Sequence, residues 1–211
     1  MKDLIIVGAG GMARKVFVTL RRLNEKEPKW NIIGCIDDNE HALDGVRFDL
    51  GIIGRISDWQ PTENQVFVMG ISDPKLKHKI SDMLVARGAK FETIVSPDVL
   101  LGDYVEIGEG SVILTPYNVD SGVRIGKFVT LLGSTIALDG VIGDYSTTAG
   151  FANLTNAVIG KEVYVGSHVV LVENTHVGDG AFISVGSIVL KDVKPHEQVF
   201  GYPARVVGIK E

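Results

Sequence analysis

Three glycines near the start of the chain have the spacing of a nucleotide-binding loop. Gly8, Gly10 and Gly11 follow an apolar stretch, and the run GAGGMA fits the pattern G-x-G-x-x-G/A. Glycine lets the backbone turn tightly and approach a diphosphate, and the N-terminus of the following helix favours negative charge. We therefore predict that this loop holds the phosphates of a nucleotide.

An acidic pair and two further residues extend this predicted site. Asp37 and Asp38 close a second apolar stretch and can accept hydrogen bonds from a ribose or a base edge. Met12 in the loop and Gly70 in a third apolar stretch complete the predicted substrate-binding set. The alternative is a glycine turn that only packs a helix on a strand, beside two solvated acids. The motif alone does not distinguish NAD from a nucleotide sugar.

Composition narrows the classes of protein. The formal net charge of -5 is spread over interspersed acids and bases, so neither a nucleic-acid site nor a membrane-surface segment is expected. The apolar run at residues 4–7 is too short for a signal peptide or a membrane span. Cys35 is the single cysteine, which favours a reducing cytoplasm and a buried place in a strand. No pair of histidines has metal-ligand spacing with a cysteine or an acid, so we expect no metal site.

Strands and helices alternate in the first part of the chain. An amphipathic helix is expected after the glycine loop, and a second helix from Pro74, because Asp73 is a suitable N-cap and Gly88 suits the C-terminal end. This alternation predicts a small Rossmann-like domain with a parallel sheet over residues 1–90. Its strands are expected at residues 4–7, 32–36 and 66–71, with a last strand near 91–95.

A six-residue repeat of aliphatic residues follows, over residues 91–211. Most intervals are multiples of six, with five-residue steps where a corner tightens. Such a repeat is typical of a parallel β-helix, which is a poor partner for completing a nicotinamide site. An aliphatic residue directly precedes glycine at Ile107, Ile125, Ile142, Ile159, Val165 and Val177. The remaining beats are filled by Leu101, Ile113, Val119, Leu131, Leu154, Leu171, Ile183 and Val189.

Four stretches of the sequence resemble nucleotide-sugar acetyltransferases of the sialic-acid and bacillosamine type. They are "IIVGAGGMARKV", "IIGCIDDN", "VIGDYSTTAG" and "VLKDVKPHEQVFGYPARVVG". The last is a specific ending of hexapeptide-repeat acyltransferases, and the resemblance covers nearly the whole chain. It implies a left-handed β-helix and a homotrimer with acetyl-CoA between neighbouring β-helices. It also implies a nucleotide-linked amino sugar held by the glycine loop and the acidic pair.

The chain departs from that family where catalysis is expected. The family usually carries a Glu-His-Asp-like segment whose histidine is the general base, and here the corresponding residues are Ala137, Leu138 and Asp139. A second family histidine, near the thioester, corresponds to Thr147, and a family asparagine corresponds to Leu131. Leucine cannot accept a proton, so Asp139 is the one remaining catalytic candidate of this set.

The resemblance also implies a set of residues that contact acetyl-CoA. This cofactor-binding set consists of Thr147, His168, Gly186, Lys191 and Arg205. Lys191 and Arg205 are expected to meet the phosphates of coenzyme A, and ordinary solvated charge is the alternative. His168 stands beside the expected groove, where it contacts the coenzyme, replaces the missing base or points into solvent.

The leading hypothesis is a cytoplasmic, homotrimeric N-acyltransferase that uses acetyl-CoA to acylate a nucleotide-linked amino sugar. A neutral amine is already nucleophilic and can lose its proton to water, a substrate phosphate or Asp139 after attack. The alternative is a non-catalytic nucleotide-sugar-binding protein on an acyltransferase scaffold, and a weaker one is an NAD-binding protein. Tyr117, which interrupts the repeat, is expected either to touch substrate or to cap the edge of a coil.

Overall fold

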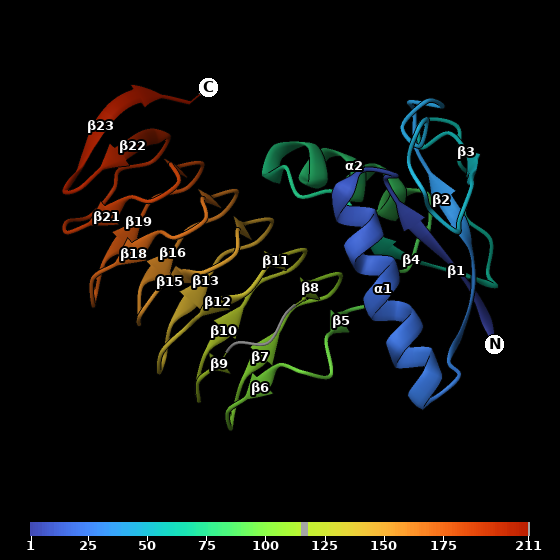
Figure 1. Ribbon diagram of the computed structural model, residues 1–211, viewed down its shortest axis with the longest axis horizontal. Helices are drawn as coiled ribbons and strands as arrows, with labels where there is room; N and C mark the ends of the chain where they lie inside the picture. Colours follow the sequence, from blue (N-terminus) through green and yellow to red (C-terminus); the bar gives the residue numbers. More distant parts are fainter. Residues whose placement is uncertain (115–117, 211) are drawn as a thin grey trace.

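The computed structural model describes residues 1–114 and 118–210, so the expectation for Tyr117 lies outside the described residues. An α/β domain and a parallel β-helix lie side by side, and the coils of the β-helix lead away toward the C-terminus (Figure 1). The fold class expected from the sequence is confirmed. The expected domain boundary at residue 90 falls between the last helix of the α/β domain and the first strand of the β-helix.

The α/β domain is built on a parallel sheet with strand order β3-β2-β1-β4. Its central strand is fully buried from Leu4 to Val7 because it has a neighbour on each side and helices pack against it. Cys35 is buried in the next strand, and burial raises the pKa of its thiol to about 12. The strands are β1 Lys2–Val7, β2 Trp30–Ile36, β3 Ile52–Gly54 and β4 Gln65–Met69.

Two helices complete this domain, α1 (Gly11–Lys26) and α2 (Pro74–Ala86). The expected start of α2 is confirmed, since the Asp73 side chain accepts a hydrogen bond from the Leu76 N–H at 2.8 Å. Gly88 follows its C-terminus with a φ of 94°, in the left-handed region that favours glycine. The strand expected over residues 91–95 is divided: Phe91 forms an isolated bridge to Phe67, whereas β5 (Ile94–Val95) joins the β-helix.

Short strands make up the β-helix and stack into parallel ladders that run along its axis. One ladder consists of β5, β8 (Val112–Ile113), β11 (Thr130–Leu131), β14 (Thr147–Thr148), β17 (Tyr164–Val165), β20 (Phe182–Ile183), β22 (Glu197–Gly201) and the antiparallel β23 (Ala204–Ile209). A second ladder consists of β7 (Glu106–Ile107), β10 (Arg124–Ile125), β13 (Val141–Ile142), β16 (Val158–Ile159) and β19 (His176–Val177). The third side is formed by β6 (Leu100–Leu101) with β9 (Asn118–Val119), and by β12 (Ser134–Thr135), β15 (Ala152–Asn153), β18 (Val170–Leu171) and β21 (Ile188–Val189).

The predicted six-residue repeat of aliphatic residues is confirmed in the core of the β-helix. Ile125 pairs with Ile142 and Ile142 with Ile159, so each coil brings an aliphatic side chain over the one before. The expectation for Leu101 is wrong, because its side chain is 45% exposed. Its strand β6 has a single paired neighbour, β9, and so lies at the open end of that ladder.

Three columns of turn residues form the edges of the β-helix, and we name them by their neighbours. The α1 edge consists of Gly133, Phe151, His168 and Gly186. The α2 edge consists of Phe128, Tyr145, Glu162 and Gly180. The outer edge consists of Gly122, Asp139, Asn156 and Asn174. Backbone hydrogen bonds link successive turns within the columns, as from the Phe151 N–H to Gly133, from the Tyr145 N–H to Lys127 and from the Asp139 N–H to Ser121.

Candidate functional site

The glycines of the predicted site serve two different purposes. A Cβ on Gly8 would lie 2.8 Å from Ile71 Cγ1, and one on Gly70 would lie 2.8 Å from the Val7 carbonyl oxygen. These two glycines are therefore required for close packing below the loop. Gly10 has no atom within 4 Å of such a Cβ, so the loop presents open space at this point. Gly11 begins α1 and lines a surface groove.

The two acidic residues, Asp37 and Asp38, also have different environments. Asp37 accepts a hydrogen bond from the Ala9 N–H of the glycine loop at 2.8 Å and another from the Asn39 N–H at 2.9 Å. Asp38 is exposed and accepts a hydrogen bond from the Ser57 N–H at 2.9 Å. This hydrogen bond is the main reason why the pKa of Asp38 lies below its usual value, with Arg55 nearby adding to the effect. Asp37 therefore braces the loop, and Asp38 presents the freer carboxylate.

Replacing Asp37 by alanine is expected to destabilise the glycine loop more than replacing Asp38. Each charge-assisted hydrogen bond that is lost contributes about 1.5–3 kcal/mol. Urea denaturation of the two alanine variants measures the difference in the free energy of unfolding, and equal values would contradict a bracing role for Asp37.

Two grooves meet between α1 and the β-helix. The first encloses about 520 Å³ beside the glycine loop, between Gly11, Met12 and Ser72. The second encloses about 600 Å³ and extends along α1 to Phe151. Both grooves are lined by the same three side chains, Lys15, Val18 and Leu132. The two grooves therefore adjoin each other, and together they extend from the glycine loop to the α1 edge.

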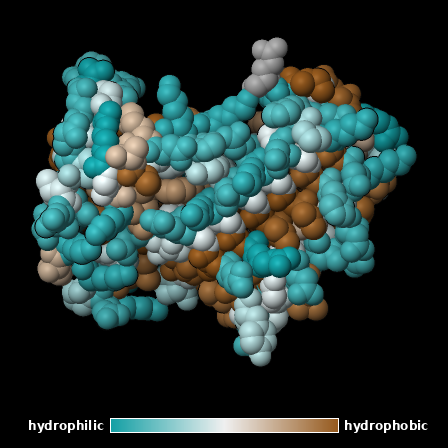
Figure 2. All heavy atoms as spheres, turned by 180° about the vertical axis from the view of Figure 1, so that it is seen from behind, coloured by the Kyte–Doolittle hydropathy of each residue, from teal (hydrophilic) through white to brown (hydrophobic). Residues whose placement is uncertain are grey.

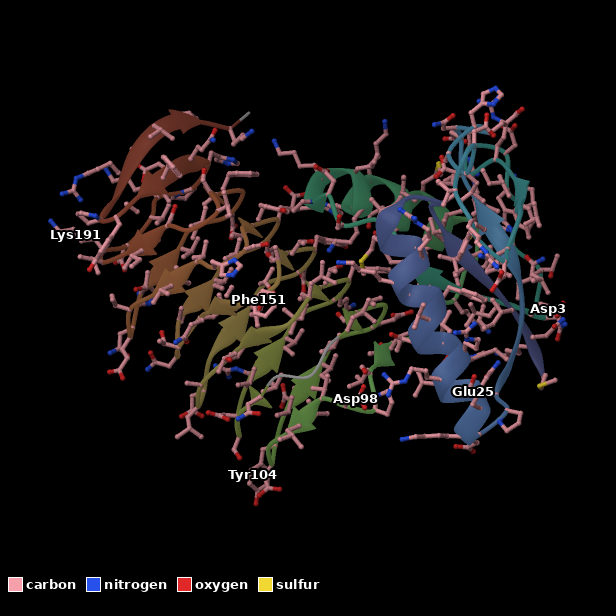
Figure 3. The ribbon with its side chains drawn as sticks, in the orientation of Figure 1. Asp3, Glu25, Asp98, Tyr104, Phe151 and Lys191 are labelled. Carbon is pink, nitrogen blue, oxygen red and sulfur yellow. The ribbon has the colours of Figure 1, made fainter. Side chains whose placement is uncertain are left out.

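The far end of the second groove is defined by an ion pair and an aromatic stack. Arg22 on α1 donates to both carboxylate oxygens of Asp98, with the closer Nη1–Oδ2 distance 2.5 Å. The Arg22 guanidinium lowers the pKa of Asp98, mainly through these hydrogen bonds. Phe151 is 63% exposed and stacks on His168, with ring centroids 5.1 Å apart. In Figure 3 Asp98 lies beside α1 and Phe151 lies midway along the β-helix.

The predicted cations lie further along the β-helix. Lys191 and Arg205 line one groove of about 380 Å³ at the C-terminal hairpin, together with Pro203 and the acids Asp192 and Glu197. Lys191 lies at the C-terminal end of the coils in Figure 3. The sequence-based expectation that both cations meet the phosphates of coenzyme A stays a prediction. Lysine and arginine are residue types that bind phosphates, and here two acids line the same groove.

Known proteins match both halves of the chain. The profile of the PglD N-terminal domain family matches residues 3–84. A GDP-perosamine N-acetyltransferase from Escherichia coli O157:H7 is 30% identical over 127 residues, which are 60% of this chain and 52% of that protein. Among solved structures, WeeI from Acinetobacter baumannii AYE is 27% identical, with a TM-score of 0.87 over 98% of this chain and 100% of that chain.

A third protein confirms that the fold extends over both domains. The acetyltransferase domain of PglB from Neisseria gonorrhoeae FA1090 has a TM-score of 0.89 at 22% identity, over 98% of this chain and 100% of that chain. The same domain has been solved in complex with acetyl coenzyme A. Residues 3–84 therefore match the PglD N-terminal domain family, and the chain as a whole is similar to hexapeptide-repeat acetyltransferases. It spans about half the length of the curated relative named above.

Two positions that the sequence resemblance matches to catalytic residues lie apart from the grooves in this protomer. Leu138 and Asp139 lie on the outer edge, whereas the grooves follow α1 and the α1 edge. Leu138 is 58% exposed. Asp139 is also exposed and has a φ of 61°, with its carboxylate over Gly122. The catalytic role expected for Asp139 therefore has no support within a single protomer.

Thr147 is buried in the structure, which contradicts the expectation that it binds the cofactor. Its side chain is only 1% exposed, because α2 and the loop before it cover β14. Its hydroxyl donates to the Ser72 carbonyl oxygen at 2.6 Å and accepts from Lys77 Nζ at 3.0 Å. Thr147 therefore joins the two domains and has no surface for a coenzyme. His168 and Gly186, by contrast, lie on the α1 edge beyond Phe151.

Several groove residues were missed in the sequence. Lys15, Val18 and Arg22 line the second groove, and their spacing of three and four residues places them along one stripe of α1. This spacing is visible in the sequence, but Lys15 and Arg22 equally suit the solvent-exposed face of an amphipathic helix. Nothing in the sequence indicated that Phe151 and Leu132 line a groove, because they lie outside the positions of the six-residue aliphatic repeat.

Among the described residues, no group of three or more His, Cys, Asp and Glu side chains has an arrangement that could hold a metal ion. No helix in the described part of the chain is long and apolar enough to cross a membrane.

Proposed function

We propose that this protein transfers the acetyl group of acetyl-CoA to the amine of a nucleotide-linked amino sugar. The observation that carries the proposal is the pair of adjoining grooves that share Lys15, Val18 and Leu132 and extend from the glycine loop to the α1 edge. A nucleotide at the loop can extend its sugar along these grooves. The relative with 30% identity is named for N-acetylation of GDP-perosamine, and the PglB domain binds acetyl-CoA.

The coenzyme is proposed to lie along the α1 edge toward the C-terminal hairpin. His168 and Gly186 then flank its extended arm, and Lys191 with Arg205 receives its phosphates. Gly186 supports this path because a Cβ at that position would meet no atom within 4 Å, so the backbone there is open to a ligand.

Acyl transfer without the family histidine requires an acceptor that needs no base before attack. The nitrogen of a neutral amine forms a bond to the thioester carbon, the C–S bond breaks and the coenzyme leaves as its thiolate. The proton of the new ammonium passes to the thiolate, to water or to a substrate phosphate. With Leu138 in place of a base, the chain contributes orientation of the two substrates. A hydroxyl acceptor is disfavoured, since it needs a base far more than an amine does.

We further propose that the protein is a homotrimer in which the outer edge of one chain faces the α1 edge of another. The β-helix half exposes broad apolar surface (Figure 2). Exposed apolar side chains occur on both edges, Leu138 on the outer edge and Phe151 on the α1 edge. Contact between these edges would cover them and bring Asp139 toward the grooves.

Multi-angle light scattering at micromolar concentration is expected to give a mass near three times the 22.8 kDa of one chain. A monomeric mass would contradict the proposed trimer and the two-chain acetyl-CoA site.

The function is tested with a panel of nucleotide amino sugars, acetyl-CoA and NAD. Thermal unfolding should shift upward with acetyl-CoA and with at least one nucleotide amino sugar, because a ligand that binds the folded state stabilises it. Turnover is followed as release of the free thiol. The control is the matching nucleotide sugar with a hydroxyl in place of the amine, which should bind without turnover.

The second candidate function is nucleotide-sugar binding without catalysis. It is favoured by Leu138, whose side chain cannot accept a proton. Stabilisation by a nucleotide sugar, with no binding of acetyl-CoA and no thiol release, would select it. The buried thiol of Cys35 is consistent with a reducing compartment, and we propose the cytoplasm.

A further inference from the structure

Lys77 is a buried lysine at the junction of the two domains. It lies in the first turns of α2, and its side chain is 0% exposed. Its Nζ atom donates to Thr130 Oγ1 at 2.9 Å, to Thr147 Oγ1 at 3.0 Å and to the Ser146 carbonyl oxygen at 3.2 Å. All three acceptors belong to the β-helix, so one amine ties α2 to two successive coils.

Burying a lysine amine in this way does not favour the stability of the fold. Burial holds the pKa of Lys77 well below its usual value, and the Asp73 carboxylate offsets this only in part. The three hydrogen-bond acceptors of the amine are neutral oxygens. An apolar side chain of similar length would avoid the desolvation of an amine and still fill the space. The hydrogen bonds of the amine therefore fix the orientation of α2 relative to the β-helix, which apolar packing alone does not.

The hydrogen bonds of Lys77 lead directly to the groove walls. Thr147, which accepts from Lys77, donates to the Ser72 carbonyl oxygen, and Ser72 lines the glycine-loop groove. Thr130 begins β11, which runs into Leu132, one of the residues shared by both grooves. Lys77 thus connects one wall that belongs to the α/β domain with one wall that belongs to the β-helix.

Other contacts between the domains are less suited to this task. His78 contacts Glu162 on the α2 edge and stacks on Tyr145, but its side chain is 38% exposed. Arg22 and Asp98 form their ion pair with 46% and 40% of their side chains exposed. Ion pairs with this exposure are screened by solvent and salt, and their geometry is only loosely held.

We propose that Lys77 is a positioning residue that fixes the glycine loop relative to the α1 edge. The inference rests on the proposed acetyl transfer, because the nucleotide is held by one domain and the coenzyme by the other. Neither binding site contains Lys77. Loss of the amine should therefore leave both affinities in place and misalign the sugar amine with the thioester.

The test compares Lys77→Met with Lys79→Met, an exposed lysine two residues along the same helix. We expect kcat to fall about 10- to 100-fold in Lys77→Met, since a misplacement of about 1 Å costs this much. Dissociation constants for the nucleotide sugar and for acetyl-CoA, measured by calorimetry, should stay within about twofold of wild type. Lys79→Met should match wild type in all three quantities. A kcat within twofold of wild type in Lys77→Met would overturn the proposal.

A second pair of variants keeps the test valid if Lys77→Met fails to fold. Thr147→Ser retains the hydroxyl that links Lys77 to Ser72, and Thr147→Val removes it. Thr147→Ser should keep wild-type kcat, whereas Thr147→Val should lower kcat with both affinities intact. Equal kcat in the two variants would count against the proposal.

An activity-independent measurement separates this inference from the proposed function. Amide hydrogen exchange of residues 70–76 should be faster in Lys77→Met than in wild type and unchanged in Lys79→Met. If wild type shows no turnover with any substrate of the panel, the proposed function fails, and the exchange experiment still decides whether Lys77 fixes this loop. Unchanged exchange in Lys77→Met would refute the positioning role.

Discussion

Gly70→Ala is expected to lower the free energy of unfolding by about 3 kcal/mol, because the added methyl group has no space. Its Cβ would lie 2.8 Å from both Ile6 Cγ2 and the Val7 carbonyl oxygen, and 3.0 Å from Ala13 Cβ. These atoms belong to the central strand and to the first turn of α1. Neither can retreat without moving the glycine loop that joins them, so nucleotide affinity should fall together with stability.

Gly10→Ala is the matched control for this substitution. Gly10 has a φ of -77°, which any residue adopts, and no atom lies within 4 Å of an added Cβ. We expect a loss of less than about 1 kcal/mol, which is the usual difference between glycine and alanine at a helix N-cap. Urea denaturation measures both variants. The packing argument fails if Gly70→Ala is no less stable than Gly10→Ala.

If the proposed acetyl transfer holds, turnover by the wild-type protein is expected to rise about tenfold per pH unit until the acceptor amine is mostly neutral. In the proposed mechanism Leu138 takes the place of the family histidine, so no imidazole of the protein has to lose a proton before the amine attacks. The rate should therefore follow the titration of the substrate and then reach a plateau. The measurement is kcat/KM for the amino sugar at saturating acetyl-CoA over about pH 6 to 9. Two acceptors with different amine pKa values should give correspondingly displaced profiles.

His168 is the residue that decides between this account and a relocated base. His168→Ala should retain turnover, with weaker acetyl-CoA binding if the ring contacts the coenzyme beside Phe151. Loss of turnover with both substrates still bound would make His168 the base and contradict the prediction. Leu138→His alone should change little, because Ala137 and Thr147 offer no exposed partner to orient an imidazole.

The sequence predicted those parts of the molecule that depend on local pattern. The aliphatic beat identified the β-helix because every coil must bury one such side chain over the next, as Ile125, Ile142 and Ile159 do. The GAGGMA run identified the glycine loop because its conformation depends on the residue types themselves. The pattern gave a wrong prediction for Leu101. A terminal coil has the same sequence pattern as an inner coil, but it lacks a neighbouring coil to cover its side chains.

The contacts between the domains were not predictable in this way. Lys77 meets Thr130 and Thr147 across 53 and 70 positions of the chain, and nothing near it in sequence distinguishes it from Lys79. Thr147 was assigned to the cofactor by its place in the family pattern, whereas its environment is set by α2 packing over β14. Such pairings depend on how two finished domains dock, which a local pattern does not contain.

The regular spacing of the coils also sets distances along the β-helix. Along the α1 edge, Phe151, His168 and Gly186 are separated by one coil each, and neighbouring strands lie about 4.8 Å apart. The distance from the end of the α1 groove to the Lys191 and Arg205 groove is therefore set in whole steps by the number of coils between them. Duplication of one coil of 17 or 18 residues would leave every ladder paired, yet it would move those two cations by one step. In the proposed acetyl-CoA site, the length of the coenzyme arm that fits is thus set by the number of coils and not by any single side chain.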